Sequence, residues 1–142
     1  METKRLGNLG ELKVLTKFAE HSIPVYIPYG DTERIDLIAD FNGKLNRIQV
    51  KSTEKSVNGV FDFYLRSTAT NTQLTKYNYY ASNEVDYFVF YAKETDEVYI
   101  IDYANCPATN LKLRLVPPAN GQKTGIKMAA DYTLDKFLSE QN

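Results

Sequence analysis

The stretch Arg34-Ile-Asp-Leu-Ile-Ala-Asp-Phe-Asn-Gly-Lys-Leu-Asn-Arg-Ile-Gln-Val-Lys-Ser52 predicts a β-hairpin whose register follows from the sequence. Asn42-Gly43 is typical of a two-residue type I′ turn, because both central residues of that turn need a positive φ. The residues that flank such a turn pair with each other, and counting outward from it places Asp36 opposite Gln49.

Side chains alternate between the faces of a strand, so the predicted hairpin has one apolar and one polar face. The apolar face carries Ile35, Leu37, Ala39, Phe41, Ile48 and Val50, and the polar face carries Arg34, Asp36, Arg47, Gln49 and Lys51. A slip of one residue would bury the charges, so the apolar face fixes the register. Opposed side chains have Cβ atoms roughly 5 Å apart, which brings a carboxylate, an amide oxygen and a lysine together.

This polar face has the chemistry of a metal-assisted phosphate site. Carboxylate and amide oxygens are hard ligands of the kind that Mg²⁺ accepts beside substrate phosphate oxygens. A lysine next to them can orient an attacking water or neutralise charge on a phosphate. The alternative is an idle, solvated polar face with one cross-strand polar pair.

The segment from Glu2 to His21 is predicted to be a helix with Leu12, Leu15, Phe18 and Ala19 along its buried stripe. Glu11 lies at helical spacing before two of these residues, so its carboxylate is expected to point toward the core and to need a partner. A metal shared with Asp36 would supply one; a salt bridge to Arg34 or Lys51 is the alternative. Gly7 and Gly10 weaken the helix, which is tolerable where a backbone approaches closely.

Asp36 followed by Gln49-Val50-Lys51, after a helix with Gly7-Asn-Leu-Gly10-Glu11, resembles the core of the PD-(D/E)xK nucleases. Within that superfamily the chain is most similar to the homing endonucleases encoded in bacterial group I introns. The similarity extends to the segments Val85-Asp-Tyr-Phe-Val-Phe-Tyr91, Val98-Tyr-Ile-Ile-Asp102 and Arg114-Leu-Val-Pro-Pro-Ala-Asn-Gly-Gln122.

The resemblance implies an α/β (α+β) fold with a restriction-endonuclease-like core: an N-terminal helix on a mixed β-sheet, further strands and a C-terminal helix. It implies hydrolysis of both strands of duplex DNA with Mg²⁺ or Mn²⁺. Asp36 would be the main metal ligand, Glu11, Gln49 and the Val50 carbonyl would support it, and Lys51 would position the water. One site per chain implies at least a dimer, and the resemblance implies a tetramer.

Gln49 departs from the family pattern, because an amide stands where the family has a second acid. The lost negative charge should weaken metal binding unless Glu11 makes up for it. Two alternatives to the homing enzyme therefore stay open: a Holliday-junction resolvase of the same superfamily, and an inactive relic that only binds DNA.

The net charge of −1, from 17 basic and 18 acidic residues, lacks the basic excess common in DNA-binding domains. We expect a basic cleft on an acidic body instead, with acids gathered at Glu84, Asp86, Glu94, Asp96 and Glu97. The residues expected to contact DNA are Arg34, Arg47, Lys55, Arg66, Asn71, Gln73, Lys76, Asn120, Gln122, Lys123 and Lys127.

The length of 142 residues and the hydrophobic content of 43% predict a single domain, residues 1–142. No apolar run approaches the ~20 residues of a membrane span, and a lone cysteine, Cys106, excludes an internal disulfide and suits the cytoplasm. His21 is the only histidine and more plausibly caps a helix than binds zinc.

Beyond Lys51 the pattern predicts a strand at 60–65, a hairpin at 87–103 and a closing helix at 131–141 with Leu134, Phe137 and Leu138 inward. The polar segment from Ser67 to Tyr80 is expected to be a DNA-contacting loop, or else a solvated loop or short helix. The segment from Lys112 to Lys127 is a second candidate surface, in which Pro117-Pro118 breaks regular structure.

Overall fold

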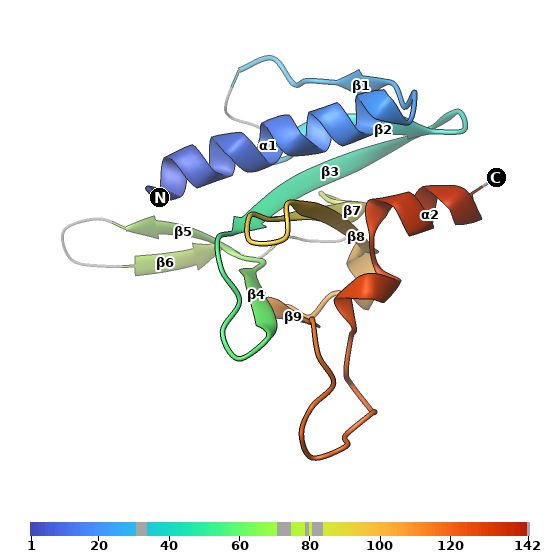
Figure 1. The fold of residues 1–142 in the computed structure, drawn as a ribbon. Coiled ribbons are helices and arrows are strands. Elements are labelled where there is room, and N and C mark those ends of the chain that lie inside the picture. Colours follow the sequence, from blue (N-terminus) through green and yellow to red (C-terminus); the bar gives the residue numbers. More distant parts are fainter. Residues whose placement is uncertain (31–33, 71–74, 79, 81–83, 142) are drawn as a thin grey trace.

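The chain forms an α+β fold in a computed structural model that describes residues 1–30, 34–70, 75–78, 80 and 84–141 (Figure 1). For residues 67–70 and 75–78 it describes the backbone alone. A mixed sheet of five strands has the order β1-β2-β3-β7-β8, where only the β3–β7 pair is parallel. These strands are β1 Val25–Tyr26, β2 Leu37–Phe41, β3 Lys44–Thr53, β7 Tyr87–Ala92 and β8 Glu97–Asp102. The predicted mixed sheet is confirmed.

The β2–β3 hairpin has the predicted register over its whole ladder, from Phe41↔Lys44 at the turn to Leu37↔Ile48. Asn42 and Gly43 have φ values of 54° and 90°, as a type I′ turn requires. The Asp40 carboxylate accepts a hydrogen bond from the Gly43 N–H at 2.6 Å, which stabilises the turn.

The ladder stops one residue short of the predicted pair of Asp36 with Gln49. Asp36 lies in a bend before β2, where its N–H donates to the Ile48 carbonyl at 2.9 Å. Its carboxylate accepts a hydrogen bond of 2.8 Å from the Val50 N–H. In a regular ladder, a backbone carbonyl of the partner strand would accept this hydrogen bond instead. The bend also reverses Ile35, which packs against the opposite face of the sheet from Leu37. The predicted pairing of Asp36 and the predicted side of Ile35 were therefore wrong.

Helix α1, Thr3–Glu20, lies across β3 and β7. Its buried line is Gly10, Val14 and Phe18, spaced four residues apart. Leu12 is 61% exposed and Ala19 is exposed, so the predicted stripe was partly wrong. The apolar spacing of the sequence fits two neighbouring stripes, and the narrow line beside Gly10 is the one that contacts the sheet.

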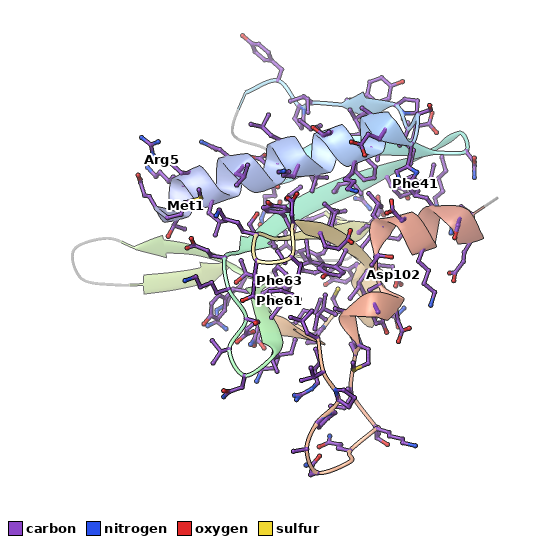
Figure 2. The ribbon with its side chains drawn as sticks, in the orientation of Figure 1. Met1, Arg5, Phe41, Phe61, Phe63 and Asp102 are labelled. Carbon is purple, nitrogen blue, oxygen red and sulfur yellow. The ribbon has the colours of Figure 1, made fainter. Side chains whose placement is uncertain are left out.

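Two apolar cores cover the two faces of the sheet. The first lies under α1 and the C-terminal helix α2, Leu134–Glu140, where Phe41 contacts Phe137 with ring centroids 5.5 Å apart. The second lies between β7–β8 and a two-stranded sheet of β4 and β9, where Phe63 contacts Phe90 at 4.7 Å. Figure 2 labels Phe61 and Phe63 on β4 and Phe41 beside the C-terminal helix. β7 is thus buried on both faces.

Strands β4, Val60–Tyr64, and β9, Asn110–Arg114, pair antiparallel. Lys112 lies in β9, although it was predicted to belong to the irregular segment that follows. Strands β5, Ser67–Thr70, and β6, Thr75–Asn78, form a hairpin where a loop or short helix was predicted. Its polar residues lack the apolar alternation by which a strand is identified in sequence.

The C-terminal helix follows its prediction. The Thr133 hydroxyl caps it by accepting the Lys136 N–H at 3.2 Å, while Leu134 and Leu138 are buried. Short 3-10 turns at Tyr103–Asn105 and Ala129–Asp131 complete the described structure. Among the described residues, no helix has the length and apolarity needed to cross a membrane.

The two helix glycines should respond in opposite ways to alanine. A Cβ on Gly10 would lie 1.9 Å from the Ser52 hydroxyl and 3.1 Å from its Cβ, whereas a Cβ on Gly7 meets nothing within 4 Å. We expect Gly7→Ala to raise the free energy of unfolding by about 1 kcal/mol through helix propensity. Gly10→Ala should lower it by about 1–3 kcal/mol through overpacking, as measured by urea denaturation.

Ser52→Ala supplies the control for this pair, because the Ser52 hydroxyl is buried without a hydrogen-bond partner. Removing it should recover part of the loss in the Gly10→Ala background. Equal stabilisation by both glycine substitutions would contradict the close approach of α1 to β3.

Candidate active site

Three ionisable side chains meet where α1 passes the bend before β2 and the last residues of β3. Glu11 comes from α1, Asp36 from the bend and Lys51 from β3, and all three are half-buried. The carboxyl groups of Glu11 and Asp36 lie close enough to shift each other's pKa, and Lys51 acts on Asp36 through its charge. The Val50 N–H holds the Asp36 carboxylate at the sheet edge, between the faces from which Glu11 and Lys51 reach it.

Burial disfavours the charged form of both carboxyl groups. Burial raises the pKa of Glu11 above its usual value, and the neighbouring Asp36 raises it further. Burial also raises the pKa of Asp36, although the Val50 N–H, Glu11 and Lys51 pull that pKa back down. A site with two crowded carboxylates has an electrostatic demand for a cation.

Burial lowers the pKa of the Lys51 ammonium, and the nearby Arg34 lowers it further, against the opposing pull of Asp36. The Lys51 Nζ lies 5.1 Å from the centre of the Tyr80 ring, and the Arg34 guanidinium carbon lies 4.1 Å from it. Both cations are therefore placed over the negative face of one aromatic ring.

Tyr80 and Glu84 are site residues that the sequence analysis missed. The Tyr80 carbonyl accepts a hydrogen bond from the Tyr103 hydroxyl at 2.7 Å. Glu84 accepts two hydrogen bonds from one Arg34 nitrogen, each 2.9 Å long. Neither residue belongs to a motif, and both are far in sequence from the hairpin residues that they contact.

Arg47 is engaged in an ion pair of its own. It contacts both carboxylate oxygens of Asp86 at 2.9 Å, and its backbone N–H donates to the same carboxylate at 2.8 Å. The expected separation of acids from the basic hairpin was therefore wrong, since Glu84 and Asp86 lie directly against Arg34 and Arg47.

The oxygen donors at the site fit a hard divalent cation such as Mg²⁺ or Mn²⁺. Among the described residues, no group of three or more His, Cys, Asp and Glu side chains forms a metal cluster. A cation would therefore use the carboxylates of Glu11 and Asp36, with the Gln49 amide and the Val50 carbonyl as neutral donors. The raised pKa values of both carboxyl groups are the observation that favours this fit.

The remaining predicted DNA-contacting residues are spread over the molecule. Lys55 follows β3 and is exposed, Arg66 lies between β4 and β5, and Lys76 is on β6, where only the backbone is described. Asn71 and Gln73 lie outside the described residues. Asn120, Gln122, Lys123 and Lys127 lie in the loop after β9, on the far side of the molecule from α1 in Figure 1. The described side chains among them, those of Lys55, Arg66, Asn120, Gln122, Lys123 and Lys127, come from separate segments of the chain.

Two comparisons with known proteins match most of the chain. The model of the PD-(D/E)XK endonuclease family matches residues 1–135. The solved structure of a bacterial homing endonuclease, I-Ssp6803I, is similar to the chain with a TM-score of 0.74 and 25% sequence identity. That similarity covers 99% of this chain and 95% of the other. Among curated proteins, no relative matches.

The crowded carboxylates generate a prediction for stability without metal. Both pKa values are raised in the folded state, so the folded protein binds protons more readily than the unfolded chain. The resulting penalty is absent below the ordinary carboxyl pKa and develops as the pH rises through the raised values. Glu11→Gln should therefore increase the urea midpoint in EDTA at pH 7.5, and the gain should shrink toward pH 4.

Glu20→Gln is the matched control, because Glu20 is exposed on the same helix. It removes an equal charge away from Asp36 and should leave the pH profile of the wild type unchanged. A gain for Glu11→Gln that is the same at both pH values would contradict the electrostatic penalty.

Proposed function

The chain belongs to the PD-(D/E)XK endonuclease family, and from this premise we propose that it is a site-specific DNA endonuclease of the intron-homing type. It hydrolyses phosphodiesters in both strands of duplex DNA with Mg²⁺. The observation that carries the proposal is the convergence of Glu11, Asp36 and Lys51 at one edge of the sheet.

Glu11, Asp36, Gln49 and the Val50 carbonyl hold the cation, with Asp36 as the main ligand. When bound, Mg²⁺ or Mn²⁺ supplies positive charge that stabilises the phosphate in the transition state and favours ionisation of water. Asp36 is prepared for this role because the Val50 N–H orients its carboxylate while leaving the other oxygen for a ligand.

Lys51 positions the attacking water and stabilises negative charge that develops on the phosphate. Burial lowers its pKa, so its proton is easier to release than that of an exposed lysine. The Tyr80 ring lies under both Lys51 and Arg34, so the ring supports the Lys51 ammonium beside Asp36.

Gln49 gives this site one negative charge fewer than the family pattern, and Glu11 compensates. The influence of Asp36 on the pKa of Glu11 supports this assignment, because it requires a second carboxyl group beside the first. Gln49→Glu should then bind the metal more tightly. In an inactive relic the same substitution would be needed to create cleavage.

Cutting both strands requires two copies of the site, so we propose a homodimer at minimum and a tetramer as the working assembly. Residues 1–142 act as one nuclease domain in each subunit. Analytical ultracentrifugation with and without duplex DNA measures the stoichiometry, and a monomer in both conditions would contradict this part of the proposal.

The central prediction is the loss of cleavage on removal of either charge partner. Asp36→Ala and Lys51→Ala should each lower the cleavage rate of a duplex DNA library in Mg²⁺ by at least about 10²-fold, as the loss of one electrostatic stabiliser does in other enzymes. The products are mapped by sequencing, which also identifies the target.

Lys44→Ala serves as the control, since Lys44 is an exposed lysine on the same hairpin. Undiminished cutting by Asp36→Ala or Lys51→Ala would overturn the assignment. Faster cutting of four-way junctions than of linear duplex would identify a resolvase instead. Metal-independent binding without any cleavage would identify a DNA-binding relic.

A further inference from the structure

The outer face of the β4–β9 sheet carries a shallow groove of about 680 Å³. The inner side chains of both strands fill the second core, so the outer ones alternate with them and face away from it. Cross-strand pairing sets Asp62 opposite Lys112 and Val60 opposite Arg114. Lys55, from the segment after β3, also lines the groove.

The groove is positively charged, with three basic side chains and one acid. Within the described part of the chain, Lys55, Lys112 and Arg114 form no ion pair. The acid, Asp62, accepts a hydrogen bond from the Asn110 amide at 2.6 Å. The positive charge of the groove can therefore attract an anionic ligand. Arg34 and Arg47 differ from these residues, because Glu84 and Asp86 of the same chain neutralise them.

The groove continues the face of β3 that carries Lys51. Thr53 lines the groove and lies two residues after Lys51 on the same strand, so their side chains share a face about 6–7 Å apart. A polyanion with one phosphate at Lys51 would therefore reach the groove with the phosphates that follow.

We propose that this face of β4–β9 binds the phosphate backbone of duplex DNA beside the scissile phosphate. The proposal rests on the proposed function for its ligand. Lys55 and Lys112 supply point charges, Arg114 supplies a planar guanidinium, and the 64% exposed Tyr64 supplies a hydroxyl, all of which are common phosphate donors. Because it contacts backbone only, the face contributes affinity without sequence preference.

The test is the salt dependence of DNA binding by the full chain with Lys55→Gln and Lys112→Gln together. In EDTA, the slope of log K against log[salt] should become shallower by about 2, near 0.9 for each lost phosphate contact, and affinity should fall by about tenfold. The loss should be equal for unrelated duplexes. Lys136→Gln, on α2, is the control and should leave the slope unchanged.

Arg114→Gln provides a second test, with circular dichroism to verify folding, because the Arg114 Nε also donates to the Val116 carbonyl at 3.0 Å. At saturating DNA the control Lys136→Gln should cleave at the wild-type rate. If the wild type cleaves DNA and the variants bind it with the same slope and affinity as the wild type, the proposal for this surface alone is overturned. A sequence-dependent loss would also overturn it, whereas a wild type that cleaves nothing refutes the proposed function separately.

Discussion

The hydrogen bond from the Val50 N–H to the Asp36 carboxylate is the constraint on which the candidate active site depends. It ends the β2–β3 ladder with a side chain in place of a backbone carbonyl, and so turns Asp36 from a strand residue into a residue of the sheet edge. At the edge, Asp36 is accessible both to Glu11 from the helix layer and to Lys51 from the opposite face. A regular ladder through Asp36 would have separated it from Glu11 by the thickness of the sheet.

The sequence contained enough information to predict the hairpin, because an Asn-Gly turn and strict apolar alternation specify one register. It also indicated the closing helix and β7–β8. It could not reveal where the ladder ends, since the bend at Asp36 arises from a side-chain hydrogen bond with no signature in composition. The exposed Leu12 shows the same limit: two stripes satisfied helical spacing, and only close contact at Gly10 selects between them. Tyr80 and Glu84 reach the site through long-range topology that local patterns do not encode.

Acidic and basic side chains near the hairpin form ion pairs with each other and do not lie on separate surfaces. Arg34 and Arg47, which sequence reasoning placed on the DNA, are held by Glu84 and Asp86, so they stiffen the scaffold around Lys51. Basic side chains that form no ion pair with any described residue lie instead on the outer face of β4–β9. A net charge of −1 is therefore compatible with a polyanion-binding face. The opposite imbalance, two crowded carboxyl groups with raised pKa values, lies at the candidate active site.

The parallel pairing of β3 with β7 gives the fold a modular character. A parallel connection must cross over the sheet, and the described part of this crossover contains the strands β4, β5 and β6. Leu65 precedes the β5–β6 hairpin and Val85 follows it, and both are buried in the second core. The connection therefore leaves this core before the hairpin and returns to it afterwards. A hairpin of another length could therefore replace β5–β6 while Leu65 and Val85 keep their places in the second core.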